Sequence, residues 1–321
     1  MDEVIKRAMD RFEHCQDAEA ENRARAMDDL RFSLGDQWPD DIKRAREGDA
    51  DGSRPCLTVD KLDQYIRQVV NDARQNKPSI KVRPKDSGAD VETAEMMQGL
   101  VRQIEDQSSA DIAYDTAVEM ATRCGFGFMR VVTDYAHDDG FLQDILIRPV
   151  VNPFSCYLDP DRTMPDGSDA RYGFFFEDIP REVFERDYPN ADPCDFESGS
   201  ADMRGWSGEE TVRIAEYVEC IYETKKVYQN EDGSSSDEEI PGAKARSIKR
   251  KKVVWYKLTC KEVLEKRDWP SQYIPIVPVY GHLIDVGGER KFRSLLAPAI
   301  DAQRMYNYAA SAFVEDRKSV V

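Results

Sequence analysis

Four aspartates stand close enough together in the sequence to bind a divalent cation, and they fall within eleven residues. They are Asp159, Asp161, Asp166 and Asp169. Clustered carboxylates hold the metal ions of many nucleases, so this loop is a candidate for metal-dependent cleavage of DNA. The spacing does not fit an EF-hand, because Thr163 and Pro165 stand where a ligand and the glycine turn belong. Aspartate, proline and glycine also build turns, so we favour a turn and assign no metal ligands.

The densest positive stretch runs from Lys244 to Lys252. Its consecutive cations could contact phosphate or the acidic surface of a partner. They are Lys249, Arg250, Lys251 and Lys252. The same residues begin a strand expected over 249–259, where lysine and arginine guard an exposed edge, and the acidic residues 237–239 could neutralise them. We favour a solvated edge and keep a partner or phosphate patch as the alternative.

Enzyme signatures are missing from the sequence. It contains no GxxxxGK[ST] phosphate loop, no GxSxG and no HExxH, and Gly125-Phe-Gly127 follows a helix rather than a strand. The seven cysteines are odd in number and scattered, and the three histidines lie far apart. We therefore expect reduced, mostly buried thiols, without a zinc site or a disulfide framework. The sequence predicts no catalytic residues, no cofactor and no enzyme.

The composition is that of an acidic globular protein. The 321 residues include 62 acidic and 45 basic side chains, which gives a net charge of −17, and 40% are hydrophobic. This length suggests about two domains. The bulk field of such a chain repels DNA and anionic membranes, although an acidic wall could surround DNA without binding it. With no apolar leader and no run approaching the ~18 apolar residues of a membrane span, we expect folding in a cytosol.

The order of expected elements predicts an α+β fold, with helices first, antiparallel strands next and a terminal helix last. Helices are expected over 4–34, from Thr58, over 90–109 and over 110–123, with a charged loop over 40–55. Strands are expected over 80–84, 128–135, 141–151, 172–178, 212–227 and 249–259, followed by a return strand ending at Trp269. We expect a helical part over 1–125, a β-rich body over 126–290 and a helix over 291–315.

The segment from Tyr273 to Gly281 is apolar but interrupted by two prolines, so it is not an ordinary central strand. We interpret it as a stiff extended connection to a helix that runs from Phe292 to Glu315. Polar residues are interleaved with the apolar residues of that helix. The rest of the chain offers no evident surface for it to pack on, which favours identical subunits or further chain as its neighbours.

Several segments, taken in order, resemble the portal proteins of short-tailed, podovirus-type bacteriophages over nearly the whole chain. The sharpest is Ile274-Pro-Ile-Val-Pro-Val-Tyr-Gly281, followed by Asp301-Ala-Gln-Arg-Met-Tyr-Asn307. The others are Leu57–Leu62, Asn76–Val82, Gly125–Val131, Val151–Ser155, Leu158–Asp161 and Asp169–Tyr172. Each segment alone is weak, whereas the ordered set is specific.

The resemblance implies a ring, usually of twelve identical subunits, at one capsid vertex, through which double-stranded DNA is packaged and ejected without sequence-specific contacts. It implies docking of the terminase large subunit, whose motor hydrolyses ATP, and contacts with scaffolding, coat, head-completion and tail adaptor proteins. The protein would be made in the host cytoplasm and located in the virion. It would be neither an enzyme nor bound to a membrane.

The resemblance also assigns regions of the chain. Residues 1–125 would be the helical part of the wing, 126–290 the wing and hip body, and 291–315 the first stem helix. Side chains of that helix and its approach would contact neighbouring subunits or the channel. They are Arg293, Gln303, Arg304 and Asn307.

The sequence departs from the family at its end, where the clip, the second stem helix and the crown are expected to follow. Residues 316–321 do not continue the helical pattern, so we expect a non-native tail there. Two alternatives from other functional classes remain. One is a metal-dependent nuclease that uses the Asp159–Asp169 loop, and the other is a soluble adaptor that binds partners through its N-terminal helix.

Overall fold

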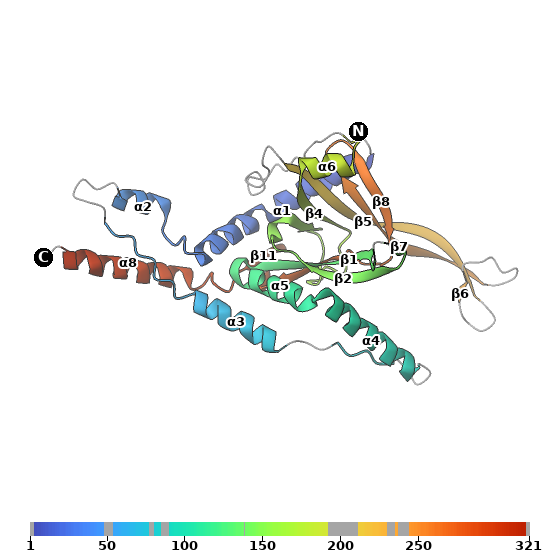
Figure 1. Cartoon of the computed structure of the whole chain (residues 1–321), viewed down its shortest axis with the longest axis horizontal. Coiled ribbons are helices and arrows are strands. Elements are labelled where there is room, and N and C mark those ends of the chain that lie inside the picture. The colour runs from blue at the N-terminus through green and yellow to red at the C-terminus, as the bar shows by residue number, and fades with distance from the viewer. Residues whose placement is uncertain are drawn as a thin grey trace. The chain divides into compact units, whose positions relative to one another are not determined.

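The computed structural model describes residues 3–47, 54–76, 80–84, 90–137, 139–191, 211–229, 235–236 and 244–318. The chain forms two compact units, and each combines segments that lie far apart in the sequence. Unit 1 contains Met1–Glu19 and Phe154–Ile276, and unit 2 contains Ala20–Pro153 and Val277–Val321. Helices and antiparallel sheets build both units (Figure 1), which confirms the predicted α+β class.

Unit 1 is organised around one antiparallel sheet with the strand order β3-β4-β5-β7-β8. Its strands are β3 (Cys156–Leu158), β4 (Tyr172–Pro180), β5 (Thr211–Gln229), β7 (Ala245–Leu258) and β8 (Val263–Trp269), and β6 (Ser235–Ser236) pairs with the end of β5. A short 3-10 helix (Pro153–Ser155) precedes β3, and α6 (Arg181–Asp187) follows β4. Strands β5 and β7 pair in continuous register from Ala215↔Leu258 to Tyr228↔Ala245, so they extend beyond the other strands as a two-stranded ribbon (Figure 1).

The core of unit 1 forms where the first half of helix α1 (Glu3–Ser33) covers this sheet. The buried residues Ile5, Ala8, Phe12 and Cys15 recur every three or four positions, which places them on one face of the helix. The Phe12 ring lies 5.1 Å from Tyr157 and 4.7 Å from Phe176, measured between ring centroids. Burial of each such aromatic side chain stabilises the unit by roughly 1.5–3 kcal/mol.

A charged cluster joins α1 to the middle of β5. The carboxylate of Glu219 accepts hydrogen bonds from Arg7 at 3.0 and 2.8 Å and from Arg11 at 2.8 Å. The Tyr217 hydroxyl also donates to it at 3.0 Å. Burial alone would raise the pKa of Glu219, but its hydrogen bond with Arg7 and the other partners lower the pKa below its usual range. The ionised carboxylate is therefore the form that unit 1 needs.

We expect Glu219→Gln to lower the free energy of unfolding of unit 1 by about 1–3 kcal/mol at pH 7, because two guanidinium groups lose their counter-charge. The pKa of Glu219 is lower in the folded chain than in the unfolded chain. The contribution of the carboxylate to stability is therefore fully present above the pKa of the unfolded chain, and it is lost as the pH falls through the pKa of the folded chain. The difference from the parent protein should therefore shrink on acidification. Urea unfolding at several pH values, with exposed Glu177→Gln as the control, measures this, and a pH-independent difference would contradict it.

Unit 2 contains a sheet of order β2-β1-β9, formed by β1 (Phe126–Tyr135), β2 (Gln143–Pro149) and β9 (Ile276–Tyr280), and a hairpin of β10 (His282–Val286) and β11 (Glu289–Arg293). Its helices are the second half of α1, α2 (Asp40–Glu47), α3 (Asp63–Gln75), α4 (Val91–Ser108), α5 (Ala110–Cys124) and α8 (Ile300–Lys318). Helix α5 packs on β1 and α3 packs on α5. The proline-interrupted β9 lies at the edge of its sheet, as its sequence requires.

Small residues let α5 lie directly against strand β1. The buried face of α5 carries Ala113, Ala117 and Ala121. A Cβ added at Gly127 would lie 2.2 Å from the carbonyl oxygen of Ala117, so only glycine fits there. Gly125 ends the helix in a left-handed conformation with φ of 94°. The Gly125-Phe-Gly127 sequence is therefore a helix stop followed by a close approach of two backbones.

Five features differ from the predictions. Residues 80–84 lie in no strand, and the loop expected over 40–55 contains helix α2. The helix expected from Thr58 begins at Asp63, because the backbone before it is extended and bonded to α8. The helix expected from Phe292 begins at Ile300, because β11 takes the residues up to Arg293 and Pro298 follows. The end of this helix includes Asp316, where we expected the pattern to stop.

The described cysteines follow the prediction with one exception. Cys15, Cys56, Cys124, Cys156 and Cys220 are free thiols. Cys260 is disulfide-bonded, so the expectation of reduced thiols is wrong there. Cys194 lies outside the described residues. None of the described helices has the length and apolarity that a bilayer crossing requires.

Candidate functional site

The acidic loop of unit 1 uses its carboxylates to bind protein groups. Asp159 is fully buried and accepts hydrogen bonds from the Arg171 side chain at 2.6 and 3.0 Å, and Arg171 also donates to Asp161. Asp169 accepts from the backbone and the hydroxyl of Thr163 at 2.6 Å, and Asp166 accepts from Ser168. Burial would raise the pKa of Asp159, but the hydrogen bond with Arg171 and two backbone donors lower it.

This arrangement is a turn held by Asp–Arg and Asp–backbone bonds. Within the described ranges, no group of three or more His, Cys, Asp or Glu side chains is placed to hold a metal ion. The geometry therefore adds no support to the nuclease alternative.

The polar side of helix α8 binds an extended segment of unit 2, residues 57–61, which we call the strap. The backbone N–H groups of Lys61, Val59 and Leu57 donate in turn to Gln303 Oε1 at 3.2 Å, Asn307 Oδ1 at 3.1 Å and Ser311 Oγ at 3.0 Å. Gln303 Nε2 also donates to the carbonyl oxygen of Val59 at 2.7 Å. The three helix side chains are at most 4% exposed.

The match between helix and strap has a geometric basis. Four residues of an α-helix advance about 6.0 Å, and two residues of an extended chain advance about 6.6 Å. Side chains at every fourth helix position therefore meet every second N–H of the strap. Asn307 Nδ2 donates to Oε1 of buried Gln37 at 2.7 Å, and Gln303 Nε2 donates to Asn307 Oδ1 at 3.0 Å, so the buried amides bond one another as well.

Aromatic and charged contacts hold the same helix at both ends. The Trp38 ring lies 4.7 Å from Tyr308, and its Nε1 donates to the strap carbonyl of Leu57 at 3.2 Å. Arg46 bonds Glu315 at 2.9 Å. A cluster of buried apolar residues packs under the start of the helix, with Ala299 and Ile300 against it. It comprises Phe32, Leu62, Ile66, Val70 and Leu296. The expectation that this helix has nothing to pack on within the chain is therefore wrong.

The four predicted subunit or channel residues divide into two kinds. Gln303 and Asn307 are buried and bonded to the strap. Their four-residue spacing on the helix lets their amides form hydrogen bonds with alternate backbone groups of the extended strap. Arg293 is exposed at the end of β11. Arg304 is partly exposed, and its guanidinium lies 5.4 Å from the centre of the Phe32 ring. Ser311 lies in the same row of polar residues as Gln303 and Asn307, although it was not selected from the sequence. The regular spacing of four residues between the three was the signal that could have identified it.

We expect Asn307→Ala to destabilise unit 2 by about 2–4 kcal/mol, because the N–H of Val59 and Oε1 of buried Gln37 lose their partners. Hydrogen exchange of the strap amides, Leu57, Val59 and Lys61, should speed up in the variant. The exposed residue Met305 provides the matched control on the same helix. Unchanged exchange in Asn307→Ala, or equal acceleration in Met305→Ala, would contradict the role of the strap contacts.

The opposite side of α8 is exposed and apolar, and we call it the outer stripe. Met305 is 72% exposed, Tyr306 48% and Phe313 63%. Alanines complete the row at intervals of three or four positions. They are Ala302, Ala309 and Ala312. The helix thus has one polar face bonded to its own chain and one apolar face in contact with solvent.

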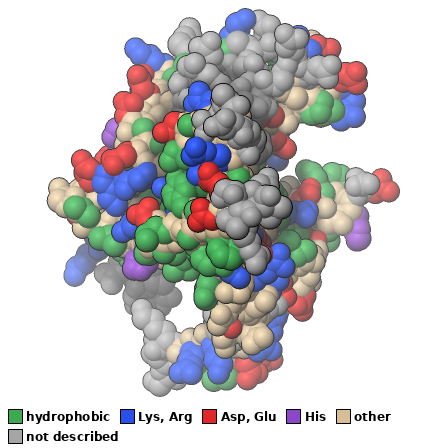
Figure 2. Space-filling view, turned by 90° about the vertical axis from the view of Figure 1, so that its left-hand side faces the viewer, with side chains coloured by type: hydrophobic (Ala, Val, Ile, Leu, Met, Phe, Trp, Pro, Cys, Tyr) green, Lys and Arg blue, Asp and Glu red, His purple; other side chains and the backbone are tan. Residues whose placement is uncertain are grey.

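The predicted basic patch lies on β7, where the strand pairs with β5 alone, because β8 begins to pair only at Val253. Lys252 pairs with Asp268 at 3.0 Å, and the Lys251 ammonium lies 5.7 Å from the centre of the Tyr273 ring. Lys249 and Arg250 are exposed. Among the described strands, the patch therefore lies along the edge of β7 that β8 leaves open. On the face drawn in Figure 2, acidic and basic side chains alternate, and neither sign forms a continuous field.

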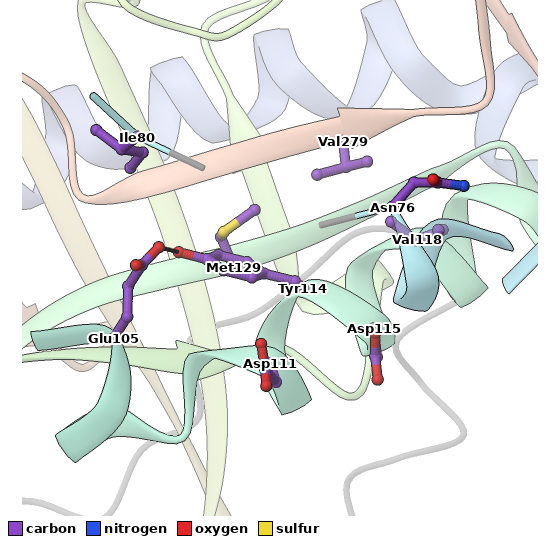
Figure 3. A pocket seen from close by; sticks show the side chains of 10 residues that line it. Asn76, Ile80, Glu105, Asp111, Tyr114, Asp115, Val118, Met129 and Val279 are labelled. Atoms are coloured by element: carbon purple, nitrogen blue, oxygen red, sulfur yellow. Dashed lines mark hydrogen bonds between the residues drawn. The ribbon is translucent and has the colours of Figure 1, made fainter. Parts of the chain in front are cut away.

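A pocket of about 400 Å³ opens in unit 2 between the end of α3, helices α4 and α5, and strands β1 and β9 (Figure 3). Its lining combines apolar side chains with three carboxylates. The apolar lining comprises Ala73, Ile80, Val118, Met129 and Val279, and the acidic lining comprises Glu105, Asp111 and Asp115. The Tyr114 hydroxyl donates to Glu105 at 3.0 Å, and burial together with this bond raises the pKa of Tyr114 to about 12.

Comparison with known families gives a match over almost the whole chain. The family model of the phage P22-like portal protein matches residues 9–316. The chain belongs to the P22-like portal protein family. A portal protein of Acyrthosiphon pisum secondary endosymbiont phage 1 is similar to it, with 27% identity over 344 residues. That alignment covers 98% of this chain and 47% of the relative, so the chain spans about half the length of this portal protein.

The portal match includes both partners of the strap contact and both sides of the pocket, because all of these residues fall within 9–316. The two sharpest parts of the sequence resemblance are Asp301–Asn307 and the segment Ile274–Gly281, which contains two prolines. The first of these contains Gln303 and Asn307, which bind the strap. The strap itself lies in Leu57–Leu62, another segment of the resemblance.

Proposed function

We propose that this portal-family chain forms part of a subunit that assembles with identical copies into a ring at one capsid vertex, through which double-stranded DNA is packaged and ejected. The family match over residues 9–316 carries this proposal. Because the chain spans about half of the similar portal protein, the activity of the whole subunit is part of the proposal.

The outer stripe of α8 supports association between copies. Large side chains such as Met305 and Phe313 are exposed along the same line of the helix. Exposing an apolar row of this length to water is energetically unfavourable, and such rows usually mark a protein interface. The inner face of α8 is already satisfied by the strap, so the outer stripe is the face that remains for another subunit or for further portal chain.

The net charge of −17 suits a passage rather than a binding site for DNA. An acidic surface does not retain phosphate, so the duplex can move past it. In this proposal Arg293 and Arg304 remain candidates for channel or subunit contacts, whereas Gln303 and Asn307 position the helix. The acidic loop forms a turn and supports no catalytic role.

The partners and location follow from the same family membership. We propose that the ring is dodecameric, resides in the virion, and is docked by the terminase large subunit, with scaffolding, coat, head-completion and tail adaptor proteins as neighbours. Residues 1–125 and 126–290 would contribute to wing and hip, and 291–315 to the first stem helix. The protein acts as a structural connector, and ATP hydrolysis belongs to the motor.

We expect the purified chain to associate with itself in a concentration-dependent way, and the double variant Met305→Asp, Phe313→Asp to weaken this association at least about tenfold. Two charges placed on the outer stripe would have to be buried without partners. Sedimentation velocity measures the association, and negative-stain electron microscopy shows whether the products are rings or arcs. The matched control is Phe141→Asp, because Phe141 is 97% exposed and lies away from α8 in the sequence.

A parent chain that remains monomeric at every protein concentration would overturn the ring proposal for this part of the subunit. Equal association of the parent and the double variant would instead remove the outer stripe from the interface.

A further inference from the structure

Strands β5 and β7 continue beyond their own sheet as a two-stranded ribbon (Figure 1). We define the ribbon as residues 221–227 of β5 paired with 246–252 of β7. Among the described strands, β4 pairs with β5 only as far as Glu219 and β8 pairs with β7 only from Val253, so no third strand borders the ribbon. It extends for about 24 Å. A ribbon of two strands is at best marginally stable alone in water, which points to a partner outside the sheet.

The ribbon is cationic, although the chain is acidic overall. It contains seven cationic side chains and one carboxylate, Glu223, and five of the seven cations lie on β7. Arg246, Lys226 and Lys249 are exposed, and none of them forms an ion pair, a hydrogen bond or a ring contact with another described residue. These three side chains are therefore available to an external anion.

The three available cations lie on both faces of the ribbon. Side chains alternate between the faces along a strand, and residues that oppose each other in the register share a face. Lys226 opposes Ser247, so Lys249 is its diagonal neighbour on the same face, about 7–8 Å away. Arg246 opposes Val227 and lies on the other face. The ribbon therefore presents positive charge in two opposite directions.

We infer that the β7 edge of the ribbon lies in the major groove of double-stranded DNA, where its cations contact the phosphates on both sides without reading the sequence. The major groove is about 12 Å wide and admits a two-stranded β-ribbon. A row of phosphates borders the groove on each side, so a ribbon with cations on both faces can contact the two rows at once. Each phosphate contact releases condensed counterions, which provides the binding free energy.

An acidic surface of a second copy fits the ribbon less well than DNA does. Such a surface contacts one face of the ribbon and leaves the cations of the other face without a partner, whereas a groove contacts both faces. The net charge of −17 confines the contact to this element, because the bulk field of the chain repels phosphate. The inference goes beyond the proposed passage of DNA, since a single chain can make this contact without a ring.

Fluorescence anisotropy of the full chain with a labelled 30-base-pair duplex tests the contact. We expect Arg246→Gln, Lys226→Gln, Lys249→Gln to weaken binding at least about tenfold at about 50 mM salt. The slope of log affinity against log salt should become shallower by about 2–3, because each lost phosphate contact releases fewer counterions. Equal affinity of this variant and the parent, or a parent that does not bind, would overturn the inference.

Two control variants separate the loss of these contacts from other effects. The triple variant Lys6→Gln, Arg31→Gln, Lys43→Gln removes the same charge from exposed positions outside the ribbon and should bind like the parent. The exchange Arg246→Lys, Lys226→Arg, Lys249→Arg keeps the charges and should also retain binding. Weakening of the same size in either control would contradict a specific contact by these cations.

The two faces can be tested separately. The pair Lys226→Gln, Lys249→Gln changes one face and Arg246→Gln changes the other, and each should weaken binding. Methyl green, which occupies the major groove, should displace the protein, whereas the minor-groove ligand netropsin should not. An effect confined to one face, or displacement by netropsin alone, would show that the ribbon does not lie in the major groove.

The connection between the two strands of the ribbon provides a test of opposite sign. Residues 230–243 carry five acidic side chains in the sequence and lie largely outside the described residues, so we assign them no place in the site. Replacing Asp237, Glu238 and Glu239 by their amides should tighten DNA binding, because carboxylates repel phosphate. Weaker binding of this variant would contradict a phosphate contact by the neighbouring cations.

The outcomes separate this inference from the proposed function. Sedimentation velocity without DNA, applied to the same variants, reports association between copies. A parent chain that associates but does not bind the duplex overturns only the ribbon contact, whereas a monomer that binds the duplex through the ribbon overturns only the ring. If the ribbon variants lose association and keep DNA binding, the ribbon is a contact between copies and the inference is wrong.

Discussion

The position of α8 depends on the bonding between its buried polar row and the strap. Gln303, Asn307 and Ser311 offer oxygens to the N–H groups of alternate strap residues. Neither side could be buried alone, because unpaired backbone and amide groups are costly away from water. The strap therefore fixes which face of the helix points inward. That choice leaves Met305 and Phe313 on the outside.

Unit 1 uses a different solution for the same need to bury polar groups. Arg7 and Arg11 reach the sheet from one face of α1 and meet the carboxylate of Glu219. The surrounding aromatic residues, with Phe12 at their centre, provide the apolar burial. One unit thus joins a helix to a sheet through charge, and the other joins a helix to an extended segment through neutral amides.

Much of the fold follows from the sequence, whereas the partners within the chain do not. The spacing of apolar residues in 4–34 and the glycines after α5 predicted elements that the structure contains. The segment with two prolines was predicted as an extended connection, and part of it pairs as the edge strand β9. Helix α2 was missed because its mean hydropathy is that of a loop, and none of its residues is buried. Gln303 and Asn307 could be selected from the sequence, but their partner Val59 lies more than 240 residues away. Local patterns cannot identify such a contact.

The two partners in the contact between α8 and the strap contribute different kinds of group. The helix contributes side chains, whereas Leu57, Val59 and Lys61 contribute backbone groups that almost every amino acid possesses. A substitution at 303, 307 or 311 removes a bond, but most substitutions in the strap keep it, and proline is the exception because it lacks the N–H. Over evolutionary time the strap can change its side chains while the helix must keep its amides and hydroxyl, so sequence drift should be concentrated on one side of a single contact.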